Sequence, residues 1–304
     1  MFATITGSLP PTPGPEPQAV RAQVDLQVRL GLEPVVDGRD AFAVGSDGDI
    51  VERWRAAAAL TDRAVKQALR GPYTLGHRSM GGAGDRGATT MQVAERLARD
   101  LRRLADAGCP MIEIEEPEAV RIGTDDAERA LFRDAHRTLV DPVAGTHLSL
   151  AIVGGDATAA GERLFFDLPY ASYLFDLIAG PDQWRLIARA PRERGIVCGA
   201  LDARAEAHDD PALLVWALHY AASTAGRGPD RVGVANAGSL AGLAPERLER
   251  KLRVLGDAAR IAAAPSVDAI AANLDPRAID SRTAALGGVR PKPRPRPRIT
   301  RPPQ

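Results

Sequence analysis

Residues 111–118 read Met-Ile-Glu-Ile-Glu-Glu-Pro-Glu, an apolar segment that changes abruptly into carboxylates. The apolar half predicts a buried strand. Residues 91–107 before it carry apolar side chains at helical spacing and end at Gly108, a residue type that favours a helix C-terminus. Because buried carboxylates need partners and α/β proteins bind ligands at the carboxyl ends of strands, Glu115 and Glu116 are predicted site residues. The alternative is a solvated acidic loop.

The alternation of strand and helix continues along the chain. Predicted strands are 2–6, 34–36, 73–75, 111–116, 146–153, 173–178, 195–201 and 232–235, and predicted helices are 17–32, 50–69, 91–107, 124–139, 157–166, 181–190, 211–225 and 245–263. Strand–helix pairs in this number and order predict a (β/α)8 TIM barrel over residues 1–265. An open doubly wound sheet is the runner-up, but Gly7-Ser8-Leu9-Pro10 is not the glycine fingerprint that such a sheet carries after its first strand.

The composition changes in the predicted C-terminal extension, residues 266–304. From about Gly287 onward, Arg and Lys alternate with Pro, which predicts a disordered or polyproline tail. The segment after residue 289 holds six Arg and Lys and no acid, and because the whole chain is neutral the remainder has a net charge of −6. Six cations without aromatic residues predict only salt-sensitive, unspecific affinity for phosphate or an acidic surface, and no specific binding of nucleic acid.

The chain of 304 residues is 45% hydrophobic, enough for a large core. We expect no membrane span, because no apolar run approaches the roughly 18 residues that a span needs. Cys109 and Cys198 both adjoin predicted strands in apolar settings, which favours buried reduced thiols over a disulfide. These features together predict a cytoplasmic protein.

Polar residues end most of the predicted strands. In a barrel these ends meet at one mouth, and a mouth rich in carboxylates but poor in Lys favours a ligand with an amine or a metal over a phosphate. His147 and Ser149 are two positions apart on one strand, so they point to the same side. The predicted mouth residues are Ser8, Asp37, Thr74, His77, Glu115, Glu116, His147, Ser149, Asp176, Asp202 and Asn236.

In order along the chain, several motifs resemble the catalytic barrel of the cobalamin-independent methionine synthase family. The resemblance covers residues 1–263, one barrel rather than the two of the full-length enzyme. The motifs are Thr4-Ile5-Thr6-Gly7-Ser8-Leu9-Pro10, Val36-Asp37-Gly38, Gly71-Pro72-Tyr73-Thr74-Leu75, Ala107-Gly108-Cys109, Ile112-Glu113-Ile114-Glu115-Glu116-Pro117, Thr146-His147-Leu148-Ser149 and Val234-Ala235-Asn236.

The resemblance implies a methyltransferase of methionine biosynthesis. Its small-molecule acceptor would be a zinc-bound thiol, and its donor a methylfolate or, as in shorter single-barrel relatives, a methylated corrinoid protein. Zinc matters because a thiolate is the nucleophile, and a bound metal removes the thiol proton.

The resemblance also implies a ligand set of His-x-Cys, a Glu one strand later and a further Cys. Only His147 and Asp176 match as metal ligands, while Ser149 and Gly238 or Ser239 stand in place of the cysteines, which makes the zinc site degenerate. Glu115 aligns with the aspartate that holds the acceptor's amino group, and Arg78 with the aromatic residue that stacks on the pterin.

Three functions remain open. The first is a methyltransferase with an altered acceptor or donor. The second is a different barrel enzyme that uses His147, Asp176 and Glu116 for acid–base catalysis. The third is a catalytically silent barrel that binds a small molecule or a protein. The predicted catalytic residues are His147, Asp176 and Glu116, and the predicted substrate-binding residues are Ser8, Asp37, Glu115, Asp202 and Asn236. The structural alternative is that Glu115 or Glu116 ties down a neighbouring loop amide or an arginine such as Arg78, and for Glu116, which Pro117 follows, this role is favoured.

Overall fold

The computed structural model describes residues 1–40, 49–79, 85–140, 145–204 and 209–274. The chain divides into two compact units, Met1–Ala263 and Ala264–Gln304. In the second unit the structure describes helix α10 (Val267–Leu274), and the Pro/Arg tail predicted from about residue 287 lies outside the described residues. Within the described part of the chain, no helix has the length and apolar character that a membrane crossing requires.

The described strands of the first unit form one parallel sheet. Its order is β1-β7-β6-β5-β4-β3-β2. The strands are β1 (Phe2–Ala3), β2 (Lys66–Arg70), β3 (Met111–Glu115), β4 (His147–Ile152), β5 (Ser172–Asp176), β6 (Gly195–Asp202) and β7 (Val232–Ala237).

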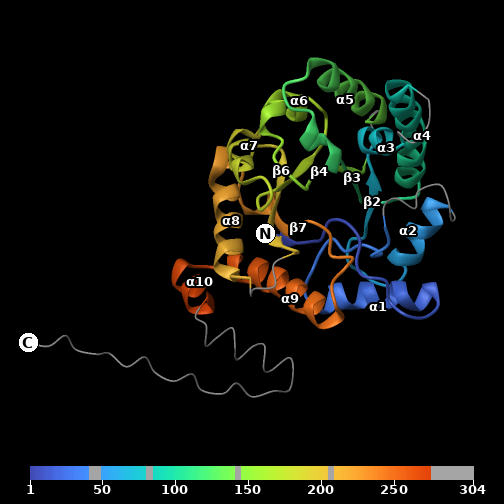
Figure 1. Cartoon of the computed structure of the whole chain (residues 1–304). Helices are drawn as coiled ribbons and strands as arrows, with labels where there is room; N and C mark the ends of the chain where they lie inside the picture. The colour runs from blue at the N-terminus through green and yellow to red at the C-terminus, as the bar shows by residue number, and fades with distance from the viewer. Residues whose placement is uncertain (41–48, 80–84, 141–144, 205–208, 275–304) are drawn as a thin grey trace, which may run out of the picture. The chain divides into compact units, whose positions relative to one another are not determined.

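Residues 33–36 contact both edge strands of this sheet. The backbone N–H of Glu33 donates to Ala3 O of β1 at 2.8 Å, and that of Lys66 in β2 donates to Val35 O at 2.9 Å. Val35 also forms a parallel bridge with Val65. The sheet therefore curls round on itself, and the strand predicted at 34–36 is reduced to a bridge (Figure 1). The α/β class and the barrel-like curl agree with the sequence prediction.

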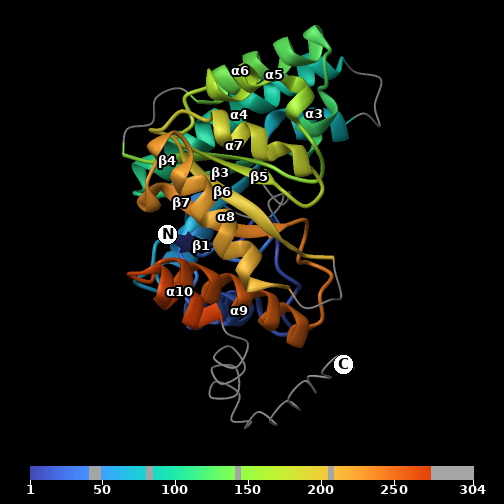
Figure 2. The same ribbon diagram turned by 90° about the vertical axis from the view of Figure 1, so that its left-hand side faces the viewer.

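Helices surround the curled sheet (Figures 1 and 2). On α4 the buried residues Ala94, Leu97, Leu101 and Leu104 follow the helical repeat, and Asp85 caps the helix by accepting from Gly87 N. The helices are α1 (Glu16–Arg29), α2 (Ile50–Ala58), α3 (Pro72–Arg78), α4 (Arg86–Asp106), α5 (Asp126–Leu139), α6 (Glu162–Phe166), α7 (Trp184–Arg189), α8 (Pro211–Ser223) and α9 (Pro245–Ala262).

Two predicted elements near β2 are wrong. The predicted helix 50–69 ends at Ala58, and its last part is strand β2, while the predicted strand 73–75 lies inside helix α3. Pro72 stands in the first turn of α3, where a missing N–H costs nothing. The strand was missed because Lys66 and Arg70 are polar, so β2 lacks the apolar pattern by which a buried strand is recognised.

The interior of the curled sheet is apolar on one side and charged on the other. Ala151, Leu174, Val197 and Ala235 form a buried cluster against which Phe2 and Val153 pack. On the other side Lys66 Nζ lies 2.8 Å from Glu113 Oε2, and neither side chain is exposed. The interior is therefore closed by packing over β4–β7 and by ion pairs between β2 and β3.

Candidate functional site

The loop after β1 is tied to two other strands at the carboxyl end of the sheet. Asn236 of β7 accepts from Thr6 N at 3.0 Å and donates to Thr6 O at 2.9 Å. Glu115 of β3 accepts through Oε1 from Gly7 N at 2.7 Å and from Thr6 Oγ1 at 3.3 Å. Gly7 has φ of 76°, a left-handed conformation that suits glycine. These contacts position the partly exposed Ser8 at the end of the sheet.

Glu115 is almost completely buried, with 1% of its surface exposed. Its Oε2 lies 3.1 Å from Arg70 Nη1 on the neighbouring strand β2. Burial raises the pKa of the Glu115 carboxyl, and the positive charge of Arg70 opposes that rise. The carboxylate that the resemblance assigns to the acceptor's amino group therefore already has a cation of this chain beside it.

Asp37, which follows the bridge at Val35, is held in the same way. Its Oδ2 lies 2.5 Å from Arg53 Nε and 2.8 Å from Arg39 Nε. Burial alone would raise the pKa of the Asp37 carboxyl, but hydrogen bonds and charge attraction from the two guanidinium groups lower it overall. Asp37 is therefore ionised at neutral pH and paired within the chain.

Glu116 contacts the start of helix α3. Its carboxylate accepts from Tyr73 N at 2.9 Å and from Thr74 N at 2.7 Å, and His136 Nε2 lies 3.1 Å from Oε1. A Cβ at Gly71 would come within 2.2 Å of Oε1, so glycine is needed for this close approach. Free amides at a helix start are natural partners of a carboxylate, so these contacts fit the anchoring role favoured for Glu116.

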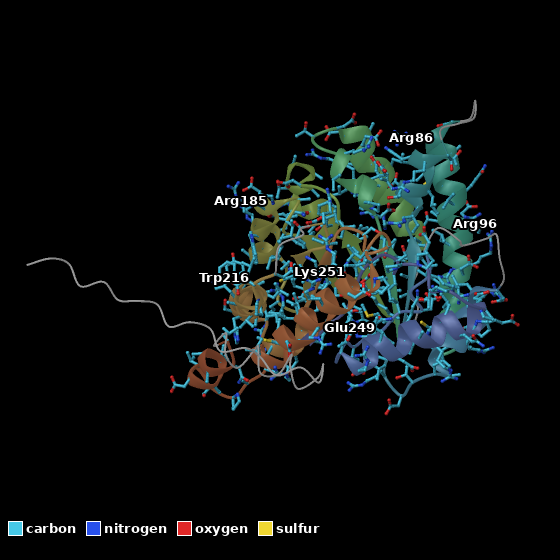
Figure 3. The ribbon with its side chains drawn as sticks, turned by 60° about the horizontal axis from the view of Figure 1, so that its bottom comes forward. Arg86, Arg96, Arg185, Trp216, Glu249 and Lys251 are labelled. Atoms are coloured by element: carbon cyan, nitrogen blue, oxygen red, sulfur yellow. The ribbon has the colours of Figure 1, made fainter. Side chains whose placement is uncertain are left out.

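Asp176 and Asp202 end the neighbouring strands β5 and β6. The buried Asp176 carboxylate accepts from three backbone amides, Gly154 N at 2.8 Å, Ile178 N at 2.9 Å and Ala179 N at 2.8 Å. Asp202 is partly exposed, and its backbone carbonyl accepts from Lys251 Nζ of α9 at 2.6 Å (Lys251 is labelled in Figure 3). Asp176 therefore shapes the loops, while Asp202 retains access to solvent.

His147 lies away from the expected mouth. It begins β4 and stands opposite Met111, the first residue of β3, whereas Glu115 ends β3 opposite Ala151. Four strand residues at about 3.3 Å each separate these levels of the sheet. The predicted set His147, Asp176 and Glu116 is therefore not brought together, because His147 precedes the buried strand core instead of following it.

The residues present do not fit the zinc ion that the resemblance implies. His147 and Asp176 lie at opposite ends of their strands, and the Asp176 oxygens already accept backbone hydrogen bonds. Gly154 follows strand β4 at this end of the sheet and donates its backbone N–H to Asp176. As a glycine it has no side chain that could bind a metal. Within the described ranges, no group of three or more His, Cys, Asp and Glu side chains is arranged to hold a metal ion.

Sequence reasoning missed the arginines of this site. Arg39, Arg53 and Arg70 come from a loop, a helix and a strand, and each contacts a strand-end carboxylate. The sequence did hold a weak signal for these contacts, because two segments carry opposite charges. Lys66 and Arg70 lie on one strand, and Glu113 and Glu115 lie on the strand that pairs with it.

Comparison with known proteins shows what part of the chain is similar to. The model of the family described as "Cobalamin-independent synthase, Catalytic domain" matches residues 18–160. A 5-methyltetrahydropteroyltriglutamate–homocysteine methyltransferase of Rhodopseudomonas palustris (strain ATCC BAA-98 / CGA009) is 29% identical over 161 residues, which cover 51% of this chain and 20% of that protein. A methionine synthase of Methanothermobacter marburgensis is 26% identical over 250 residues, covering 61% of this chain and 78% of that protein. The chain thus spans about a fifth of the length of the first relative.

Solved structures agree on the fold. A B12-independent methionine synthase from Shewanella sp. W3-18-1 has a TM-score of 0.69 at 16% identity, covering 85% of this chain and 96% of that one. A putative enzyme of the same kind from Listeria monocytogenes has a TM-score of 0.65 at 15% identity, covering 86% and 97%. The chain is therefore an α/β protein with the barrel-like fold of these enzymes. The family match over residues 18–160 and the two relatives show distant homology between this part of the chain and the catalytic domain of the cobalamin-independent methionine synthases.

Proposed function

We propose that the chain is a methionine synthase-like methyltransferase, which moves a methyl group from a methylfolate or methyl-corrinoid donor to a small acceptor at the carboxyl end of the sheet. One observation carries the proposal. Three motifs of the resemblance, around Gly7, Glu115 and Asn236, are far apart in sequence and are joined by hydrogen bonds at one edge of the sheet.

The residues at this edge divide by exposure. Ser8 and Asp202 are partly exposed and are the groups that we propose contact the acceptor. Glu115 and Asn236 are buried and act as positioning residues, because they make hydrogen bonds to the backbone just before Ser8. Orienting the acceptor toward the donor is the part of catalysis that this arrangement supplies. The residues around Asp176 do not fit zinc, so the proposed function gives a metal no role there.

A catalytically silent binding barrel is the second candidate. It is favoured by the internal pairing of the strand-end carboxylates: Glu115 with Arg70, Glu116 with the start of α3, and Asp176 with three amides. Groups already satisfied in this way are free for neither proton transfer nor metal binding. Acid–base catalysis by His147, Asp176 and Glu116 has less support, since the three side chains are not assembled.

The test is turnover with defined donors and acceptors. The chain is incubated with 5-methyltetrahydrofolate or methylcobalamin, each with homocysteine or one of a panel of small thiols, and methylated products are measured by mass spectrometry. We expect turnover with at least one donor–acceptor pair. In Ser8→Ala the turnover rate should fall by roughly tenfold or more, because one hydrogen bond to the acceptor is lost.

The matched control is Ser223→Ala. The Ser223 hydroxyl only donates to Tyr220 O at the end of α8, so turnover should be unchanged. The contrary outcome has two parts: no pair gives a methylated product, and calorimetry shows an acceptor that binds wild type more tightly than Ser8→Ala. This outcome would favour the silent binding barrel over the methyltransferase.

A further inference from the structure

A cavity of about 570 Å³ lies at the amino ends of the strands, opposite to the edge that holds Ser8 and Glu115. Phe2, Met111, Ile196 and Val197 contribute apolar walls. A Cβ on Gly233 would come 2.4 Å from the ring of Phe2, so the absence of a side chain there lets the ring lie against β7. The volume is within the range of about 300–1,000 Å³ that is typical of small-molecule sites.

A line of two hydrogen bonds, from His147 to Ser172 and from Ser172 to Ser149, leads from this cavity into the sheet. His147 and Ser172 both line it, and His147 Nε2 lies 2.8 Å from Ser172 Oγ. Ser172 Oγ donates in turn to Ser149 Oγ at 2.9 Å, and both serines are buried. With the Ser172 proton directed to Ser149, the Ser172 oxygen accepts from Nε2–H. The neutral His147 ring is left with Nδ1 as an acceptor.

The inner end of this line stands beside a buried ion pair. Ser149 is directly opposite Glu113 in the sheet, and Glu113 is bonded to Lys66. Glu113 Oε1 is buried and makes no hydrogen bond within the described part of the chain. His147 is exposed at the outer end of the line, where a ligand in the cavity can reach it.

The rim of the cavity carries equal numbers of opposite charges, Glu193 and Asp230 against Arg194 and Arg231. The arginines make hydrogen bonds to backbone carbonyls: Arg194 Nη1 donates to Tyr170 O at 2.8 Å and Arg231 Nη1 to Glu193 O at 2.5 Å. A charged ligand would lose hydration against the apolar walls without a net opposite charge to receive it. The cavity is therefore suited to a neutral ligand.

We propose that the amino-end cavity binds a small neutral molecule with an apolar body and one hydroxyl or N–H group, which donates a hydrogen bond to His147. The apolar body lies against Phe2, Met111 and Val197, and the polar group continues the line through Ser172 to Ser149. This site is separate from the proposed methyl-transfer edge and uses the two residues, His147 and Ser149, that have no part there.

Phenol is the probe, because it is neutral at pH 7 and combines an apolar ring with one hydroxyl. The chain has five histidines, so protein labelled with ¹³C at the histidine Cε1 position gives few signals. The His147 signal is assigned as the one missing in His147→Gln. We expect it to shift saturably with phenol, while the His77 and His219 signals, which come from α3 and α8, stay in place.

Ser172→Ala should weaken phenol binding about tenfold, because it removes the partner that holds the ring, and Ser223→Ala should leave the affinity unchanged. If His147→Gln does not fold, the His147 signal is assigned by its change in Ser172→Ala. A His147 signal that does not saturate with phenol would overturn the proposal. An affinity by calorimetry that is equal in wild type, His147→Gln and Ser172→Ala would do the same.

Discussion

Arg70 and Glu115 stand opposite each other at the carboxyl ends of β2 and β3, with Nη1 of Arg70 3.1 Å from Oε2 of Glu115. The guanidinium group therefore lies beside the carboxylate that the family resemblance assigns to the acceptor's ammonium group. Asp37 is paired in the same way with Arg53 and Arg39. An acceptor ammonium at either carboxylate has to compete with a cation of this chain.

The Arg70–Glu115 pair is testable by a double-mutant cycle. Arg70→Met removes the cation that contacts the buried Glu115 carboxylate, so we expect the free energy of unfolding to fall by about 3 kcal/mol. Adding Glu115→Gln should recover part of this loss, because the buried charge is removed as well. Denaturant unfolding of the four proteins measures the coupling. Single effects that simply add would show that the two side chains do not act as a pair.

Asp37 should make the free energy of unfolding depend on pH. Its folded-state pKa is lowered, so its contribution is fully present above the unfolded value of about 3.9 and is lost as the pH falls through the lower folded value. We expect Asp37→Asn to cost about 3 kcal/mol at pH 7. The difference in free energy of unfolding between Asp37→Asn and wild type should become smaller below about pH 4, where wild-type Asp37 also becomes protonated. A gap that is constant from pH 7 to pH 2, measured by urea unfolding, would contradict this pairing.

The two cysteines should be unreactive in the folded chain. Burial raises the pKa of Cys109 to about 11 and of Cys198 to about 12, so at pH 8 very little thiolate is present. We expect no fast reaction with Ellman's reagent in buffer, and release of two equivalents after denaturation, one for each cysteine. Fast labelling of a folded cysteine would mean that its thiol is accessible and ionised.

Zinc should be held weakly. Zinc sites in proteins use three or four protein ligands, usually thiolate or imidazole, and His147 and Asp176 lie at opposite ends of the sheet. After dialysis against a mild chelator, we expect well below one zinc per chain by mass spectrometry, with the same value in His147→Ala. One equivalent of zinc that disappears in Asp176→Asn would instead reveal a site at the carboxyl end of β5.

Sequence patterns predicted much of this fold because they act locally. The apolar repeat before Gly108 marks helix α4, and the apolar run ending in Glu115 marks strand β3. The carboxyl end of β3 was also predicted as part of the site, since carboxylates after a buried strand need partners. The joining of Gly7, Glu115 and Asn236 at one edge followed from the parallel arrangement of their strands.

Only the tertiary structure decided which of the polar residues meet. Strand β2 carries Lys66 and Arg70 inward, and the burial of these charges is stabilised by ion pairs with Glu113 and Glu115 on β3. His147 lies at the amino end because the register of β4 against β3 sets its level, which the spacing of His147 and Ser149 does not specify. By itself the sequence determined where apolar faces recur, because burial follows local periodicity. The pairing of charges from β2 and β3 was decided by tertiary structure, because each ion pair joins residues more than forty positions apart.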